Sequence, residues 1–101
     1  MDSEINLKDD RGRTQLFHAA VADDLQKCTY LINEGANLDV QDIEGETAIS
    51  QASFFGHTEV VRMLCKSGAQ IDVANEKDRN TALLLAANQG YTEIVEILCQ
   101  S

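Results

Sequence analysis

Three cysteines and two histidines are the side chains of this sequence best suited to metal binding or nucleophilic chemistry. Cys28, Cys65 and Cys99 are widely separated, and neither His18 nor His57 has a partner at a spacing typical of a zinc site. The sequence shows no nucleophile with a nearby base, no phosphate-binding glycine loop and no paired carboxylates in an expected pocket. We therefore predict no catalytic residue, no metal site and no cofactor, and three buried free thiols in a reducing compartment.

The charge balance bears on the kind of partner. Seventeen acidic and eight basic residues give a formal net charge of −9, which disfavours nucleic acid and anionic membranes. A basic partner would be attracted, although solubility alone also explains the charge. No apolar run approaches the ~20 residues that span a bilayer, and residues 1–6 do not resemble a signal peptide. We expect an intracellular protein, cytoplasmic or nuclear, without membrane insertion.

The elements that position these side chains follow a repeat. Thr14, Thr47 and Thr81 lie 33 and 34 residues apart, and each precedes a short helical pattern that its hydroxyl can cap. In each unit, apolar or small residues at positions i, i+3 and i+4 share one helical face. These faces are Leu16, Ala19 and Ala20; Ile49, Ala52 and Ser53; and Leu83, Ala86 and Ala87.

A second helical pattern follows each first one. Its faces are Cys28, Leu31 and Ile32; Val61, Leu64 and Cys65; and Val95, Leu98 and Cys99. Gly35 and Gly68 suit the left-handed position that closes a helix. Polar and apolar residues alternate in segments 37–42 and 70–75, which is typical of extended, half-buried links. No unit can cover its own apolar face, so the units must stack. The sequence predicts an all-α helix-turn-helix repeat solenoid with extended loop links.

These patterns resemble the ankyrin repeat family over about residues 9–101. Residues 56–69 are similar to that family's Gly-His-x-Glu-Val-Val second-helix pattern, and residues 90–95 match it again. The family's signature proline and histidine are absent from all three units, replaced by Gln15, Ala48 and Ala82 and by Phe17, Ser50 and Leu84. Without that proline, stability should fall somewhat. Arg79 stands where a turn glycine is usual, and loop 76–80, one residue longer, should be less regular than loop 42–46.

We expect one ankyrin-like domain over residues 1–101, with a tail at 1–8 and repeats at about 9–41, 42–75 and 76–101. Asp23, Asp24 and Lys27 make the first unit polar, as in an N-terminal capping repeat. The last unit keeps the internal apolar pattern, and a closing glycine would fall just past Ser101. We therefore expect a segment of a longer array, or else a partner or second copy that covers the last repeat by self-association.

The resemblance implies a partner-binding surface on the concave side, built from loop tips and the exposed residues of the first helices. Carried over position by position, it comprises Asp10, Arg11, Arg13, Val21, Ala22, Ile43, Glu44, Glu46, Phe54, Phe55, Asp78, Asn80, Asn88 and Gln89. Adjacent helical residues point about 100° apart, so at least one of the two phenylalanines should be partly exposed. The pair could anchor a partner or pack beneath a neighbouring loop. His57 should cap or brace its loop, and His18 should be a plain surface residue.

The predicted function is protein–protein recognition through this concave loop and first-helix surface, without enzymatic activity. The alternative is an accessory segment of a larger enzyme, channel or scaffold with no independent binding. A structural spacer is a third possibility.

Overall fold

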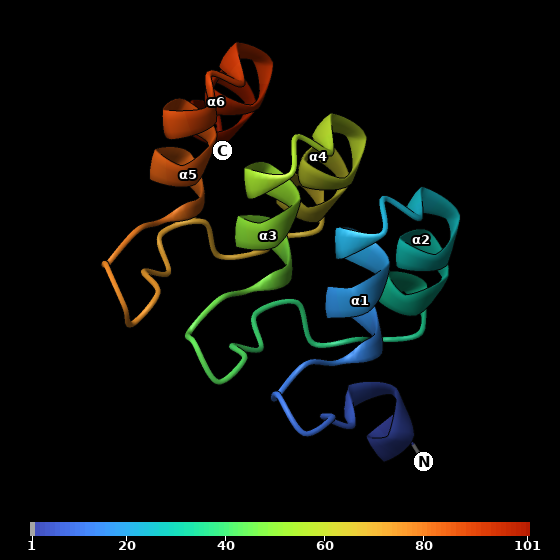
Figure 1. Cartoon of the computed structure of the whole chain (residues 1–101). Coiled ribbons are helices and arrows are strands. Elements are labelled where there is room, and N and C mark those ends of the chain that lie inside the picture. Colours follow the sequence, from blue (N-terminus) through green and yellow to red (C-terminus); the bar gives the residue numbers. More distant parts are fainter. Residues whose placement is uncertain (1) are drawn as a thin grey trace.

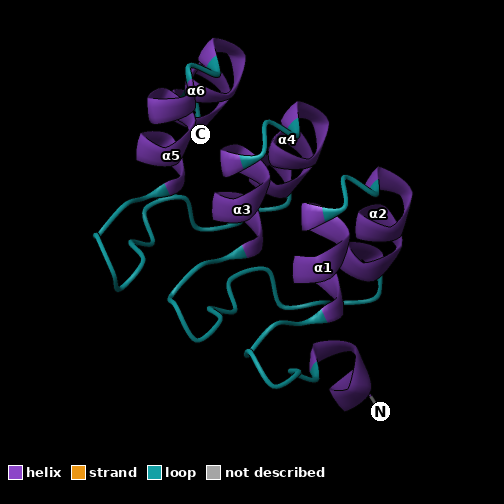
Figure 2. Ribbon diagram, in the orientation of Figure 1, coloured by secondary structure: helices purple, strands orange, loops and turns teal. Residues whose placement is uncertain are grey.

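Three helix pairs stack side by side in this computed structural model, which describes residues 2–101 (Figure 1). A short 3-10 helix, η1 (Asp2–Asn6), precedes them. The described residues hold helices, turns and links but no strand, so the predicted all-α class is confirmed (Figure 2). The pairs are α1 (Gln15–Val21) with α2 (Leu25–Asn33), α3 (Ala48–Phe54) with α4 (Thr58–Lys66), and α5 (Ala82–Gln89) with α6 (Thr92–Cys99).

Each first helix begins at the predicted threonine cap. The hydroxyls of Thr14, Thr47 and Thr81 accept from the backbone N–H three residues on, at 3.3, 3.2 and 3.4 Å. In α3 the cap is reciprocal, because Ser50 Oγ accepts from the Thr47 N–H at 2.8 Å. These bonds satisfy N–H groups that have no partner inside the helix, and so allow helices of only two turns to begin at a defined residue.

The helices form two rows. The first helices α1, α3 and α5 pack against one another, and so do the second helices α2, α4 and α6. The core lies between the rows and is built from fully buried side chains such as Leu16, Ile49, Val61, Leu64 and Ile94. Each repeat therefore buries the apolar face of its neighbour, which is the stacking that the sequence predicts.

The apolar face of the last repeat differs from the prediction. Ala86 is buried as predicted, but Leu83 and Ala87 are exposed, and Ala82 and Leu85 are buried in their place. Leu83 and Ala87 correspond by repeat position to Ile49 and Ser53, which are buried beneath the next first helix. No helix packs on α5 from that side in the described chain, so the periodic face remains open.

The cysteines also correct the prediction. All three are free thiols, but only Cys28 is buried, whereas Cys65 is half-buried and Cys99 is exposed. Cys99 lies at the end of α6, the last helix of its row, so no further repeat covers it. Cys65 lies on α4, between α2 and α6, and is only half-buried because it lines a cavity beside these helices.

Candidate functional site

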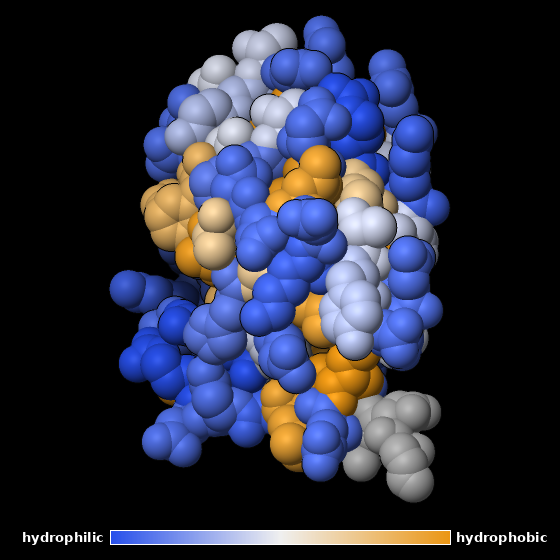
Figure 3. Space-filling model, turned by 90° about the vertical axis from the view of Figure 1, so that its right-hand side faces the viewer, coloured by the Kyte–Doolittle hydropathy of each residue, from blue (hydrophilic) through white to orange (hydrophobic). Residues whose placement is uncertain are grey.

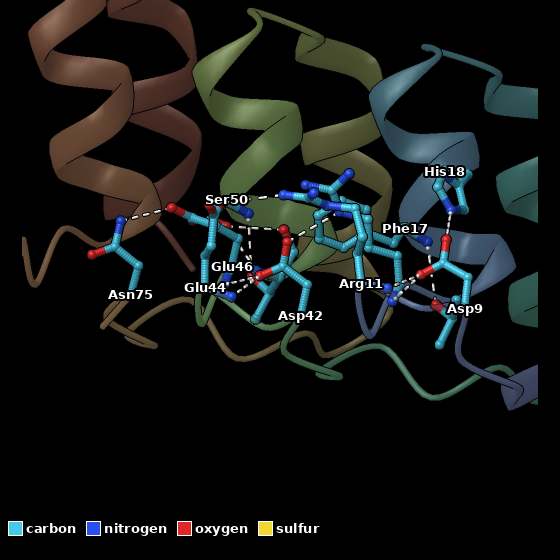
Figure 4. Close-up of polar contacts among 12 residues, drawn as sticks. Asp9, Arg11, Phe17, His18, Asp42, Glu44, Glu46, Ser50 and Asn75 are labelled. Atoms are coloured by element: carbon cyan, nitrogen blue, oxygen red, sulfur yellow. Dashed lines mark hydrogen bonds and ion pairs between the residues drawn. The ribbon is translucent and has the colours of Figure 1, made fainter. Parts of the chain in front are cut away.

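An Asp or Asn side chain closes the loop in front of each first helix. Asp9 Oδ1 accepts from the N–H groups of Arg11 and Arg13, at 2.9 and 3.0 Å. Asp42 Oδ1 accepts from the N–H groups of Glu44 and Glu46, both at 2.9 Å. Asn75 Oδ1 likewise accepts from two N–H groups of the third loop, those of Asp78 and Asn80, at 3.2 and 3.1 Å. Figure 4 shows how Asp9, Asp42 and Asn75 follow one another beneath the helices. All three loops therefore have a defined shape and project to the same side of the stack (Figure 1).

Backbone hydrogen bonds join each loop to the next. The Ile43 N–H donates to the Arg11 carbonyl at 2.9 Å, and the Glu76 N–H donates to the Glu44 carbonyl at 3.1 Å. The loops consequently form a continuous edge rather than three independent segments.

The third loop absorbs its extra residue by a change of hydrogen-bond register. Asn75 Oδ1 accepts from the N–H groups of Asp78 and Asn80, whereas Asp42 bonds the residues two and four positions on. Arg79 has φ 62°, close to the φ 83° of Gly45 at the corresponding position. The loop thus keeps a left-handed residue at the same place despite the arginine, while its hydrogen-bond register departs from that of loop 42–46, as the sequence suggested.

Arg13 links the first repeat to the second. Its Nε donates to Asp42 Oδ2 at 3.1 Å, and its guanidinium carbon lies 5.1 Å from the centre of the Phe17 ring. The Asp42 carboxylate is fully buried, so loss of the Arg13 guanidinium would leave a buried charge without its ionic partner. Arg13 is half-buried in this arrangement, which leaves only part of its side chain to a partner.

His18 is exposed as predicted, but it is not a plain surface residue. Its Nε2 donates to Asp9 Oδ2 at 2.7 Å (Figure 4). The Arg13 N–H and the His18 side chain stabilise the ionised carboxylate, and they lower the pKa of Asp9 from the usual 3.8 to about 2. The histidine therefore fixes the first loop against α1.

His57 braces two repeats, as one of the sequence alternatives proposed. Its Nε2 donates to the Val21 carbonyl at 3.0 Å, and its Nδ1 lies 3.7 Å from Asp23 Oδ2. No side-chain hydrogen bond from His57 caps α4. The Phe55 ring stacks on the imidazole with centroids 6.0 Å apart, so Phe55 is held at the end of α3.

Phe54, unlike Phe55, lines a hollow between the second and third loops. We call this cavity of about 240 Å³ the inter-loop hollow; it is lined by Glu44, Glu46, Gln51, Phe54, Asn75, Lys77, Asp78 and Leu85. The Phe54 and Phe55 rings meet edge to face with centroids 5.0 Å apart. Both rings are partly exposed, at 36% and 46%, so the expectation that at least one would be exposed is confirmed.

Comparison with known proteins agrees with this geometry. The family described as Ankyrin repeats (3 copies) matches residues 1–75, and the family described as Ankyrin repeat matches residues 78–101. The chain belongs to the ankyrin repeat family. Members of this family are generally modules for protein–protein interaction rather than catalysts.

Curated relatives share the repeats over most of this chain. The mouse Ankyrin repeat and SAM domain-containing protein 6 is 36% identical over 70 residues, which are 68% of this chain. The human Transient receptor potential cation channel subfamily A member 1 is 31% identical over 76 residues, or 75% of this chain. The chain spans 8% and 7% of these two relatives, so the similarity concerns the repeats alone.

The ankyrin stack does not gather all the predicted surface residues in one place. Glu44, Glu46 and Phe54 meet at the inter-loop hollow, and Phe55 and Val21 meet at His57. Arg11 and Arg13 belong to the first loop, and Asn88 and Gln89 lie exposed at the end of α5. Ala22 and Ile43 are exposed, and Asp10 and Asp78 are exposed on their loops while Asn80 is half-buried. Whether these residues bind a partner stays a prediction.

Sequence reasoning missed several residues of this surface. Gln51, Asn75, Lys77 and Leu85 line the inter-loop hollow although they were not singled out. The closing residues Asp9, Asp42 and Asn75 were missed as well, although they recur at the same 33-residue spacing as the first two threonines. That recurrence of Asp or Asn before each turn could have revealed them.

The remaining surface lies outside the residues predicted to bind a partner. Figure 3 looks at the side of the stack on which α2 lies and shows mainly hydrophilic side chains with small, separate hydrophobic areas. A larger cavity of about 800 Å³ lies between α4, α6 and residues 68–72, and none of the predicted surface residues lines it. Within residues 2–101 there is no helix of the length and apolarity that a membrane crossing requires, and no group of side chains that could hold a metal ion.

Proposed function

We propose that this chain binds a partner protein on its concave side, across the loop edge and the exposed faces of α1, α3 and α5. Membership of the ankyrin repeat family supports recognition as the class of function. The observation that carries the proposal is the Phe54–Phe55 pair, which is left partly exposed at the end of α3.

Physical chemistry favours these rings as anchors. An aromatic side chain offers a large contact area at a small cost in conformational entropy, and exposed aromatics are enriched among the residues that dominate binding energy. Here the mutual edge contact and the stacking on His57 already restrict the rings, so little further ordering is needed on binding. Ile43, 60% exposed at a loop tip, adds an apolar contact to the same side.

Site-specific photocrosslinking tests this assignment. A photoreactive amino acid in place of Ile43 should crosslink a partner protein from cell extract, and the same residue in place of Tyr30 should not. Tyr30 is a matched control because it is 62% exposed but belongs to α2, outside the concave surface. Capture at position 30 with none at position 43 would move the interface to the second helices and contradict the proposal.

A second candidate is a positioning role inside a larger protein. One relative is named for a SAM domain besides its ankyrin repeats and another for a cation channel, and this chain matches a small fraction of each. In that role the repeats would hold other parts of one polypeptide and bind little alone. Failure of the position-43 probe to capture any partner specifically would favour this candidate.

A further inference from the structure

The inter-loop hollow has the dimensions and lining of a site for one side chain. Its volume of about 240 Å³ falls below the ~300–1,000 Å³ that is typical of small-molecule pockets. Phe54 and Leu85 supply apolar surface from α3 and α5, and Glu44 and Asp78 supply carboxylates from the two loops. A long side chain with an apolar stem and a cationic end would match both parts.

We propose that the inter-loop hollow accepts an arginine side chain from a basic segment of the partner. This proposal rests on the proposed function and specifies the chemistry of the partner. It concerns one cavity within the concave surface, and so it can fail while the surface itself remains the binding site.

Charge complementarity favours a cation in this cavity. Glu44, Glu46 and Asp78 contribute three carboxylates to the lining, against one ammonium from Lys77. The contact between Glu44 and Arg11 is long, at 3.9 Å, and the Glu44 side chain remains 57% exposed, so its carboxylate can take another partner. The chain's net charge of −9 attracts a basic segment at longer range.

At the junction between the first and second repeats, an arginine of the chain itself already lies between an aromatic ring and a carboxylate. Between the first and second repeats, Arg13 lies over the Phe17 ring and donates to Asp42. At the corresponding position between the second and third repeats stands Glu46, which accepts from Ser50 Oγ at 2.8 Å and from Asn75 Nδ2 at 2.6 Å (Figure 4). The junction between the second and third repeats therefore has the Glu46 carboxylate at the position where the preceding junction has the Arg13 guanidinium.

Arginine suits the cavity better than lysine does. A guanidinium is planar, stacks on aromatic rings and can donate to two carboxylates at once, whereas an ammonium is a strongly hydrated point charge. The partly exposed Phe54 ring provides the stacking surface, and carboxylates approach from both loops. A cation over such a ring gains about 0.5–1 kcal/mol at exposed sites, roughly a two- to fivefold change in affinity.

The test uses the full 101-residue chain, labelled with nitrogen-15 and titrated with short peptides. The probe is acetyl-Gly-Arg-Gly-amide, and the control is the same peptide with citrulline, which keeps the shape of arginine without its charge. We expect the arginine peptide to shift the backbone amide signals of Glu44, Phe54, Asp78 and Leu85 at low salt. The citrulline peptide should not, and high salt should weaken the arginine effect.

Variants separate the cavity from general acidity. Glu44→Gln with Asp78→Asn should weaken probe binding about fivefold, since each exposed charge contributes modestly. Glu34→Gln with Glu96→Gln removes the same charge from exposed positions on the other side and should leave binding unchanged. Lys77→Gln removes the opposing ammonium and should strengthen binding. Unchanged amide spectra away from each mutated site show that the fold persists.

Two results would overturn the arginine assignment. The first is equal shifts from the arginine and citrulline peptides; the second is equal affinity in the wild type and the Glu44→Gln/Asp78→Asn variant. If a partner still crosslinks at position 43 under either result, the concave surface stands and only the arginine assignment fails. Probe binding at the hollow without any crosslinked partner would instead support the cavity and contradict the wider surface.

Discussion

The second and third loops each contain one turn residue with a left-handed backbone conformation. Substitutions at these two corresponding positions should change the stability of the fold in opposite directions. Gly45 and Arg79 occupy the same place in adjacent loops, with φ of 83° and 62°. A left-handed conformation costs a residue with a side chain about 1–2 kcal/mol. Glycine avoids this strain but loses more conformational entropy on folding, which offsets about 0.4–1 kcal/mol. Arg79→Gly should therefore stabilise the fold by about 0.5–1 kcal/mol.

Gly45→Ala should act in the other direction and more strongly. A Cβ at Gly45 would lie 2.8 Å from the Glu76 backbone nitrogen, which donates to the Glu44 carbonyl. Forcing the loops apart adds roughly 1–3 kcal/mol to the backbone strain. Gly68→Ala is the matched control, because Gly68 has φ 94° but a Cβ there would meet nothing within 4 Å.

Thermal and urea unfolding followed by circular dichroism measure all three variants. With ~4–8 °C per kcal/mol for a domain of this size, Arg79→Gly should raise Tm by a few degrees. Gly68→Ala should lower Tm by about 5 °C, and Gly45→Ala by about 10 °C or more. Equal losses in the two alanine variants would show that the loop–loop contact contributes nothing. A lower Tm for Arg79→Gly would refute the assignment of strain.

Three further predictions concern single side chains. Ser53 is fully buried, and its hydroxyl has no hydrogen-bond partner among the described residues, so Ser53→Ala should raise the urea-unfolding free energy by about 1 kcal/mol; a loss of stability would show that the hydroxyl is satisfied. Burial, with a contribution from Asp24 and Asp23, raises the pKa of Cys28 to about 11, so alkylation followed by peptide mass spectrometry should modify exposed Cys99 first and Cys28 last. The lowered pKa of Asp9 means that its contribution to stability is complete above about pH 4 and is lost as the pH falls towards 2. The stability difference between wild type and Asp9→Asn should shrink over that range, and a difference independent of pH would contradict the assigned bonds.

The sequence predicted those features whose causes are local. The hydroxyls of Thr14, Thr47 and Thr81 cap the helices that follow them, and Gly35 and Gly68 take the predicted left-handed conformation with φ of 92° and 94°. The stacking of the repeats followed from the fact that each repeat has an apolar face that only another repeat can cover. These inferences need no knowledge of which residues become neighbours.

Features that depend on neighbours could not be predicted in the same way. The burial of Leu83 was expected from its repeat position, but its exposure depends on whether another helix packs on α5. The inter-loop hollow combines Glu44 and Phe54 of one repeat with Asp78 and Leu85 of the next. A pattern within one repeat identifies each of these residues singly and says nothing about the cavity that they form together.

One measurement tests the central claim most directly. It is the affinity of the Phe54→Ala/Phe55→Ala variant for the partner that is captured at position 43. Isothermal titration should show binding of Phe54→Ala/Phe55→Ala weakened by more than ~2 kcal/mol, about 30-fold, while Tyr30→Ala binds as the wild type does. Circular dichroism should show that the double variant stays helical, because both rings are partly exposed and the core lies elsewhere. A folded double variant that binds with wild-type affinity would contradict recognition through this surface.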